Sequence, residues 1–192
     1  MISPTRPLAL VTGASSGIGA DLARELARDG HDLVLAARTV APMEKLAAEL
    51  TAYGAGTVVI PADFSQPGAA AALASAIESR GMTVDVLVNN AGIGAVGPFD
   101  EADPVRIGEM LHVNIVALTD LTRLLLPGMV ARRHGKVMLV ASTAAFQPGP
   151  RMAVYFATKA YVLSFGEAIC WKLVAVAPGH STVTVTPVPL SS

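Results

Sequence analysis

Charged residues, cysteines and aromatic residues are all scarce in this sequence of 192 residues. Charged residues make up only 15 % and hydrophobic residues 52 %, a balance richer in apolar groups than that of an average soluble domain. The formal net charge is −1, so charge predicts neither a nucleic-acid nor an anionic-membrane partner. Cys170 is the only cysteine, which excludes an internal disulfide and favours a reducing compartment.

Long hydrophobic runs are missing as well. We find no run of about 18 apolar residues, the length that spans a bilayer. The start, MISPTRPLALVTG, lacks a charged segment followed by an apolar one, so no secretory signal is expected. The four histidines, at positions 31, 112, 134 and 180, have no metal-ligand spacing, and no metal site is predicted. We therefore expect a cytoplasmic protein with one domain and no membrane partner.

Short apolar runs alternate with longer segments of helical periodicity. The apolar runs predict buried strands at 8–12, 32–37, 57–61, 84–89 and 136–142. The periodic segments predict helices at 17–30, 42–54 (with Pro42 as its first residue), 66–81, 104–133 and from 153 onward. This alternation predicts an α/β fold, a Rossmann-like doubly wound parallel sheet of about six strands with helices on both faces. In such sheets ligands bind outside the carboxyl ends of the strands.

A glycine-rich turn follows the first predicted strand. The segment TGASSGIG, residues 12–19, has glycines at positions 13, 17 and 19. Glycine lets backbone N–H groups approach a ligand closely, and the positive end of the next helix suits a pyrophosphate. The spacing is G-x-x-x-G-x-G rather than the common G-x-G-x-x-G. A tight turn without a ligand is the alternative interpretation.

Polar residues also follow the second, third and fourth predicted strands. Arg38 stands where the adenosine ribose of a dinucleotide would lie, and no Asp or Glu occurs between Leu33 and Met43. Arginine accommodates a 2′-phosphate, so NADP is favoured over NAD, with a solvated arginine as the alternative. Asp63 lies near the expected adenine site. The segment NNAG, residues 89–92, suits a ligand wall formed by backbone.

A second set of polar residues lies near the fifth predicted strand. Ser142 ends this strand, and Tyr155 and Lys159 follow on one face of the next helix, one turn apart. Asn114 lies within an apolar helical segment, where a buried amide without partners costs about 1–3 kcal/mol. Each residue alone has a structural explanation, such as a lysine that reaches water along an apolar face. Together they favour a catalytic site.

The motifs TGASSGIG, NNAG, Asn114, Ser142 and YFATK, in this order, resemble the short-chain dehydrogenase/reductase superfamily in its classical form. The resemblance covers about residues 7–167 and implies hydride transfer between NADP(H) and an alcohol or carbonyl compound. It implies that Tyr155 is the general acid or base and that Ser142 donates to the developing oxyanion. Lys159 would favour the phenolate and bind the nicotinamide ribose. Asn114 would hold a water that relays protons.

The resemblance also implies one NAD(P)-binding domain over residues 1–192 and a homodimer formed through the long helices. It implies the following cofactor-binding residues: Gly13, Ser15, Ser16, Gly17, Ile18, Gly19, Arg38, Asp63, Phe64, Asn90, Ala91, Gly92, Tyr155 and Lys159. The segments that would contact the substrate, 92–99 and 146–152, are small and apolar, which points to a hydrophobic carbonyl compound without identifying it.

The segment 174–192 is atypical because it contains no Asp, Glu, Lys or Arg. Members of the superfamily generally continue through a substrate lid and a seventh strand, so we expect a truncated or altered form that lacks both. Either VAVAPG (174–179) is the sixth strand, or the helix continues to about Val176 and TVTVTPV (182–188) is the strand. We favour the second, in which Pro178-Gly179 is not the family's proline–glycine turn. The alternative function is a catalytically weak or inactive NADP(H)-binding protein, or a fragment.

Overall fold

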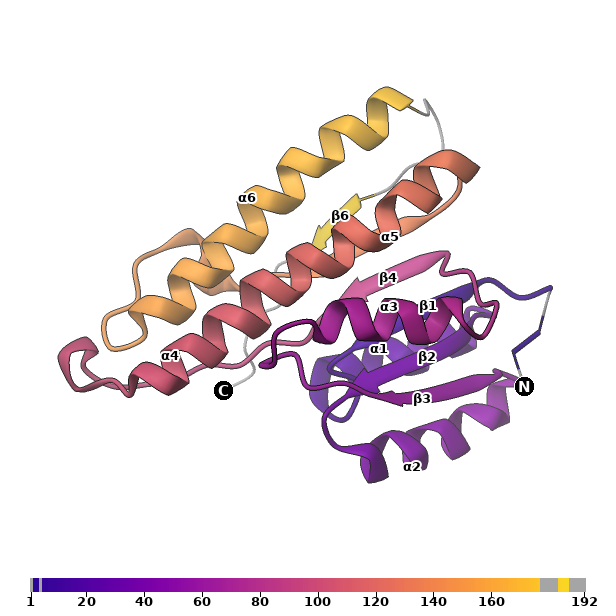
Figure 1. Ribbon diagram of the computed structural model, residues 1–192, viewed down its shortest axis with the longest axis horizontal. Coiled ribbons are helices and arrows are strands. Elements are labelled where there is room, and N and C mark those ends of the chain that lie inside the picture. Colours follow the sequence, from indigo (N-terminus) through magenta and orange to yellow (C-terminus); the bar gives the residue numbers. More distant parts are fainter. Residues whose placement is uncertain (1, 4, 177–182, 187–192) are drawn as a thin grey trace.

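One parallel sheet organises the molecule. The fold is taken from a computed structural model, which describes residues 2–3, 5–176 and 183–186. Six strands pair in the order β3-β2-β1-β4-β5-β6, and every neighbouring pair is parallel (Figure 1). The order reverses between β1 and β4, which confirms the predicted doubly wound fold. The strands are β1 (Leu8–Thr12), β2 (Asp32–Ala37), β3 (Thr57–Pro61), β4 (Val86–Asn89), β5 (Lys136–Val140) and β6 (Val183–Thr186).

Helices cover both faces of this sheet, as predicted. Helices α1 and α2 pack on one face, while α3, α5 and α6 pack on the other (Figure 1). Short helical turns η1, η2 and η4 and a π-helical turn η3 connect these elements. The helical elements are α1 (Gly17–Arg28), α2 (Val40–Leu50), η1 (Thr51–Tyr53), α3 (Ala69–Glu78), η2 (Phe99–Glu101), α4 (Pro104–Leu111), η3 (His112–Ala117), α5 (Leu118–Arg132), η4 (Thr143–Phe146) and α6 (Ala153–Val176).

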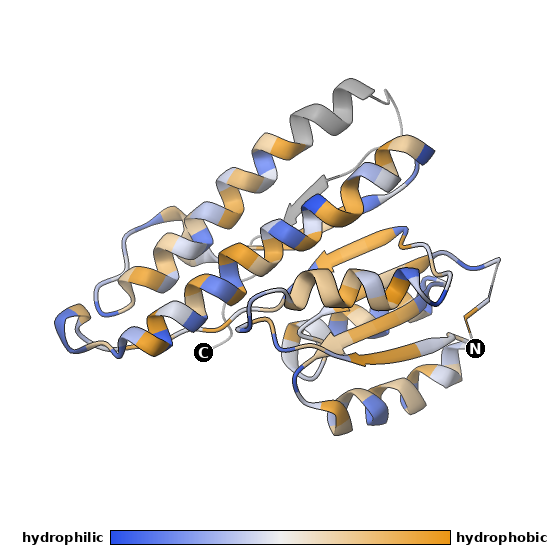
Figure 2. Cartoon of the chain, in the orientation of Figure 1, coloured by the Kyte–Doolittle hydropathy of each residue, from blue (hydrophilic) through white to orange (hydrophobic). Residues whose placement is uncertain are grey.

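The core lies on both sides of the central strands. Leu10 of β1 pairs in register with Leu87 of β4, and both side chains belong to the cluster under α3 and α5. The next pair, Val11 and Val88, belongs to the cluster under α1 and α2. All four are buried, and the strands are correspondingly apolar along their length (Figure 2). Burial on two faces explains the high apolar content of the chain.

Two predicted details of helix boundaries have different outcomes. Helix α2 begins at Val40, so the prediction that Pro42 is its first residue is wrong. Proline is tolerated at this third position because the first four N–H groups of a helix have no partner within it. Helix α6 continues to Val176 and β6 spans Val183–Thr186, which confirms the favoured placement of the last strand. The Pro178-Gly179 pair lies outside the described residues.

The predicted long helix over 104–133 is continuous from Pro104 to Arg132 and includes the π-helical turn η3. By length and composition alone it could cross a membrane. However, Val113, Leu121 and Met129 on this helix are buried in the cluster that covers the sheet. It is therefore placed as a core helix of the α/β fold.

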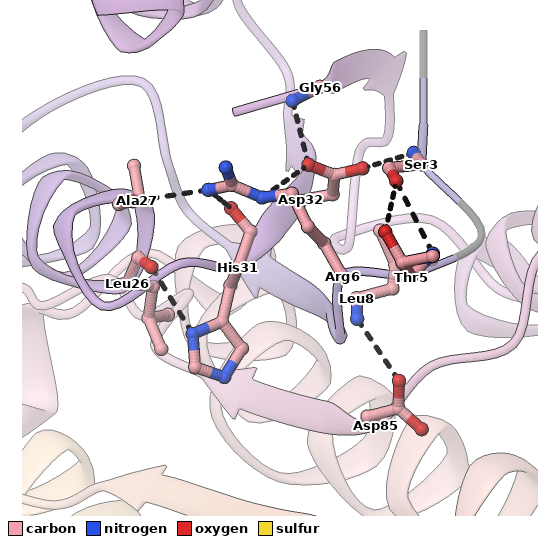
Figure 3. A network of polar contacts seen from close by, with 10 residues as sticks. All are labelled: Ser3, Thr5, Arg6, Leu8, Leu26, Ala27, His31, Asp32, Gly56 and Asp85. Atoms are coloured by element: carbon pink, nitrogen blue, oxygen red, sulfur yellow. Dashed lines mark hydrogen bonds and ion pairs between the residues drawn. The ribbon is translucent and has the colours of Figure 1, made fainter. Parts of the chain in front are cut away.

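A buried carboxylate joins three segments at the amino-terminal edge of the sheet (Figure 3). The Asp32 side chain has no exposed surface, and its Oδ1 accepts a hydrogen bond of 2.8 Å from the backbone N–H of Gly56. The same oxygen lies 3.2 Å from Nε of Arg6, and Oδ2 accepts from the backbone N–H of Ser3. Arg6 also donates to the carbonyl oxygen of His31. Asp32 therefore ties the N-terminal segment to the starts of β2 and β3.

We expect Asp32→Asn to lower the free energy of unfolding by about 2 kcal/mol, because an amide donor would then face a buried N–H or guanidinium donor. Urea unfolding followed by circular dichroism measures this change. The control is Asp29→Asn in the turn before β2, whose side chain is 80 % exposed and should contribute little. Equal stability of the two variants would contradict the assignment of Asp32 as a structural anchor.

Candidate active site

The carboxyl ends of β1 and β4 are joined at the point where the strand order reverses. The hydroxyl of Thr12, the last residue of β1, accepts hydrogen bonds of 3.0 Å from the backbone N–H groups of Asn90 and Ala91. It also donates to the carbonyl oxygen of Val88 at 3.2 Å. The Asn90 amide in turn donates to the carbonyl oxygens of Thr12 and Gly13. Sequence reasoning missed Thr12 as an anchor, although a threonine that ends an apolar strand was a usable signal.

Close packing of backbone explains two of the three glycines in TGASSGIG. Gly13 has φ +66°, and a Cβ there would lie 2.8 Å from Nδ2 of Asn90. A Cβ at Gly19 would overlap the carbonyl oxygen of Gly13 and the same amide. Gly13 borders the cavity described below, whereas Gly17 and Gly19 are absent from its walls. The structure thus gives Gly19 a packing role, and Gly17 begins helix α1.

A cavity of about 540 Å³ extends along the carboxyl ends of the strands. It brings together most of the residues predicted from sequence: Gly13, Ser15, Ser16, Ile18, Arg38, Asp63, Phe64, Asn90, Ala91, Gly92, Ser142, Tyr155 and Lys159. Ile93, Gly94 and Met152, from the segments predicted to contact the substrate, also line it. Residues that sequence reasoning did not select complete the walls: Ala37, Thr39, Ala62, Val113, Val140 and Ala141. Most of these are apolar neighbours of the motifs, and only the position of the strand ends could have indicated them.

Arg38 and Asp63 lie at one end of this cavity. Arg38 is exposed and shares the wall with Ser15, Ser16 and Thr39. Asp63 Oδ1 accepts from the hydroxyl of Ser65 at 2.8 Å and from its backbone N–H at 3.1 Å. These hydrogen bonds lower the pKa of Asp63, and the positive charge of Arg38 lowers it further. This end of the cavity therefore offers a guanidinium, two serine hydroxyls and an ionised carboxylate.

Lys159 lies at the other end and is almost completely buried. It is 6 % exposed, and its Nζ donates to the carbonyl oxygen of Val140 at 2.9 Å. The ammonium is 5.9 Å from the centre of the Tyr155 ring. Burial lowers the pKa of Lys159 to about 8, because the charged form loses its hydration. The alternative structural interpretation, a lysine that reaches water along an apolar face, is wrong.

Ser142 is buried beside Lys159 at the same end of the cavity. Its Oγ accepts a hydrogen bond of 3.1 Å from the backbone N–H of Ala144 and begins the turn η4. This bond fixes the rotamer and uses only an acceptor site of the hydroxyl, which keeps its hydrogen. Ser142 can therefore donate a hydrogen bond to a substrate oxygen beside Tyr155.

Asn114 lies in the π-helical turn η3, behind the cavity wall. Its Oδ1 accepts from the backbone N–H of Ile93 at 2.9 Å, and its Nδ2 donates to the carbonyl oxygen of Ile93 and to Thr158 Oγ1. Partners for this buried amide were predicted, and these are the partners. A Cβ on Gly92 would lie 3.4 Å from Nζ of Lys159 and 3.5 Å from Oδ1 of Asn114, so both side chains converge on that residue. Such single π turns are common at functional sites.

Sequence reasoning also missed Thr158, which is fully buried. Its Oγ1 accepts from the Asn114 amide at 3.0 Å and donates to the carbonyl oxygen of Tyr155 at 2.7 Å. Thr158 therefore joins η3 to the start of α6. The threonine in YFATK was a visible signal, but only the fold shows that it faces Asn114.

Comparison with known proteins gives consistent results. The family described as short chain dehydrogenase matches residues 7–185. The chain is 37 % identical over 168 residues to a very-long-chain 3-oxoacyl-CoA reductase from Anas platyrhynchos, covering 84 % of this chain and 53 % of that protein. The chain spans about half the length of the first curated relatives that it matches.

Solved structures show the same relationship. A short-chain dehydrogenase from Sphingobium yanoikuyae in complex with NADPH superposes with a TM-score of 0.88 at 33 % identity, over 95 % of this chain and 71 % of that one. A bulky-bulky ketone specific alcohol dehydrogenase from Comamonas testosteroni gives a TM-score of 0.88 at 32 % identity, over 95 % and 72 % of the two chains. With the doubly wound sheet and the ordered motifs, these matches show that the chain belongs to the short-chain dehydrogenase/reductase family of oxidoreductases.

Proposed function

We propose that the protein is an NADP-dependent oxidoreductase that transfers hydride between NADP(H) and an alcohol or carbonyl substrate. The observation that carries this proposal is one cavity with two chemically distinct ends. One end presents Arg38 beside the closely packed glycine turn, which fits the adenosine and phosphate groups of a dinucleotide. The other end presents Ser142, Tyr155 and the buried Lys159 around a space for the reacting carbon.

The side chains at the second end have complementary roles in the proposed reaction. When bound, the nicotinamide supplies or accepts the hydride. In the reducing direction Tyr155 donates a proton to the substrate oxygen, and it accepts that proton in oxidation. Ser142 donates a hydrogen bond to the same oxygen as negative charge develops on it. The Lys159 ammonium, 5.9 Å from the tyrosine ring, favours the phenolate in a site where water screens little.

Asn114 and Thr158 are proposed to hold this arrangement in place. Asn114 fixes the backbone at Ile93 through two hydrogen bonds of 2.9 Å. Thr158 links that amide to the carbonyl group of Tyr155. Because Lys159 Nζ and Asn114 Oδ1 converge on Gly92, Asn114 would hold a water that relays protons to the lysine.

The proposed preference for NADP depends on Arg38. Arginine forms bidentate hydrogen bonds with phosphate, and Ser15 and Ser16 add hydroxyl donors at the same end of the cavity. Several structural neighbours were solved with NADP or NADPH, among them the Sphingobium yanoikuyae enzyme, which supports a nicotinamide cofactor of this kind.

We expect Arg38→Asp to raise the Kd for NADPH by about 100-fold, because an attractive contact with the 2′-phosphate becomes repulsive. The Kd for NADH should change much less. Fluorescence titration with each reduced cofactor measures both constants. Arg28→Asp, a change of equal charge on the exposed end of α1, controls for the overall field of the protein. A similar loss for both cofactors would contradict the 2′-phosphate assignment.

The proposed reaction is tested by following NADPH absorbance with a panel of ketones and aldehydes, after binding has been measured by fluorescence. Binding together with turnover supports the proposal. Binding without turnover on any substrate would favour the alternative of an inactive NADP(H)-binding protein. Absence of binding would overturn both.

We also propose that the protein acts in the cytoplasm as a homodimer. The proposed interface is the outer surface of helices α5 and α6. Thr119 at the start of α5 and Tyr161 of α6 are joined by a hydrogen bond of 2.8 Å between their hydroxyl groups. Val116 and Leu124 are large apolar residues of the helix from Pro104 to Arg132 that remain 39 % and 38 % exposed. A partner helix pair would cover them.

A further inference from the structure

A second cavity, of about 500 Å³, adjoins the cofactor cavity. The loop after β4, helix α4 and the segment before α6 form its walls. Met152 and Tyr155 line both cavities, so the two spaces meet at the proposed proton donor. A molecule whose carbonyl group reaches Tyr155 can therefore extend a substituent into the second cavity.

The walls of this second cavity are mainly apolar. Met110 and Ile107 contribute from α4, and Phe99 contributes from the turn η2. Met152 and Val154 line the opposite wall, next to Tyr155. Phe99 is 66 % exposed without a ligand, so a bound apolar group would remove a large aromatic surface from water. An aliphatic arm of a substrate fits these walls.

Arg151 also lines the second cavity, and its backbone is unusual. Its φ is +65°, a conformation that disfavours residues with a side chain and suits glycine. The conformation is held by a hydrogen bond of 2.8 Å from the N–H of Gly97 to the carbonyl oxygen of Arg151. The other described non-glycine residue with positive φ is Arg133, which terminates α5, where a left-handed residue is common. Arg151 is the third residue of a tight turn, after Pro150, that is closed by a hydrogen bond of 3.0 Å from the N–H of Met152 to the carbonyl oxygen of Gly149. The third position of such a turn takes a positive φ, so the turn accounts for the backbone and places Arg151 at the wall of the second cavity.

The neighbouring charges leave the Arg151 guanidinium available. Arg106, the other arginine of this cavity, is bound to Glu109 at 2.9 Å. Asp103 accepts from a backbone N–H as the cap of α4, and Glu101 is the remaining carboxylate on the wall. Within the part of the chain that the structure describes, Arg151 takes part in no ion pair. It is the cation in this cavity best placed to bind an anion brought by a ligand.

We infer that the substrate is an oxo compound with an aliphatic arm that ends in a carboxylate, and that Arg151 binds this carboxylate. The inference rests on the proposed reductase function and extends it to a substrate class. The carbonyl oxygen lies at Tyr155 and Ser142, the arm crosses the apolar walls, and the planar guanidinium pairs with the carboxylate oxygens. Arg151 is thus a residue that determines specificity rather than one that moves a proton.

The test uses a series of oxo-carboxylic acids in which the number of methylene groups between carbonyl and carboxylate increases, each paired with its neutral methyl ester. With NADPH as reductant, we expect kcat/KM for the acid to exceed that for the ester by about tenfold at the best spacing. Arg151→Gly should abolish this preference without lowering Tm, because glycine suits the backbone there. Arg133→Gly is the matched control, the same substitution in the same conformation at the amino-terminal edge of the sheet, and should keep the preference.

The outcomes separate this inference from the function on which it rests. Reduction of the esters without a preference for any acid would overturn the inference and leave the reductase function intact. The same conclusion follows if Arg151→Gly keeps the preference, or if amines of matched length are preferred because Glu101 and Asp103 dominate. If no compound in either series is reduced although NADPH binds, the inference fails. The reductase function fails with it only if the panel of ketones and aldehydes is not reduced either.

Discussion

Replacing Tyr155 with phenylalanine is expected to lower kcat by about 1,000-fold, within the range for loss of a general acid. The substitution removes one oxygen and keeps the ring, which packs near the backbone of Gly94 and meets Phe156 edge to face at 6.2 Å. The shape of the cavity should therefore be retained, and the Kd for NADPH should change little. Steady-state kinetics and fluorescence titration on the same preparation measure the two quantities.

Tyr161→Phe provides the matched control for this experiment. Tyr161 lies on the same helix, and its hydroxyl bonds to Thr119 at 2.8 Å, outside the cofactor cavity. Its removal should cost about 1 kcal/mol of stability and leave turnover unchanged. If Tyr155→Phe retained more than a few per cent of the wild-type kcat, the proton donor would have to be another group.

The parallel sheet could be predicted because its strands carry a strong local signal. The runs at 8–12 and 32–37 match β1 and β2 residue for residue, since strands buried on both faces are almost continuously apolar. The last strand was harder, because two segments of similar composition compete for it. Alternating threonine and valine favoured the correct segment, observed as Val183–Thr186.

The site could be predicted to the extent that its residues stand at the ends of strands. Ser142 and Arg38 follow this rule directly. Contacts between distant segments leave no comparable signal: Thr158 meets Asn114 across 44 positions of the chain. The π-helical turn was not predicted either, because the composition of a run such as LHVNIVAL does not distinguish an α-helix from a π-helical turn. The second cavity depends on how two loops pack, and no periodic pattern encodes that packing.

Lys159→Met is expected to abolish most activity and to stabilise the fold, two effects of opposite sign from one side chain. Loss of the ammonium beside Tyr155 should lower kcat by about 100-fold or more, since a charge in a dry site acts strongly on a developing phenolate. Methionine fills nearly the same volume without a charge to desolvate. Removing the buried charge should therefore increase the free energy of unfolding. The substitution also leaves the carbonyl oxygen of Val140 without its donor at 2.9 Å, which offsets about 1 kcal/mol of this gain in stability.

The pH dependence of stability identifies the cause of that gain. Burial lowers the pKa of Lys159 from 10.5 to about 8, and this shift corresponds to about 3 kcal/mol. This loss of folding stability, caused by burying the charged lysine, is present in full below pH 8, where the lysine is charged in both the folded and the unfolded protein. It declines between about pH 8 and 10.5, where only the unfolded lysine keeps its proton, so the wild-type protein should gain stability relative to Lys159→Met over this range. Net stabilisation of the variant at pH 7 should be about 2 kcal/mol.

Urea unfolding at a series of pH values measures the difference between the two proteins. Lys45→Met, at an exposed position of α2, is the control, and its stability should differ from that of the wild type by an amount that does not depend on pH. A Lys159→Met protein that is less stable than the wild type at pH 7, with no change in the difference up to pH 10.5, would show that the buried ammonium costs the fold nothing. The lysine would then be held by partners that stabilise its charge, and its value to catalysis would no longer be opposed by a cost in stability.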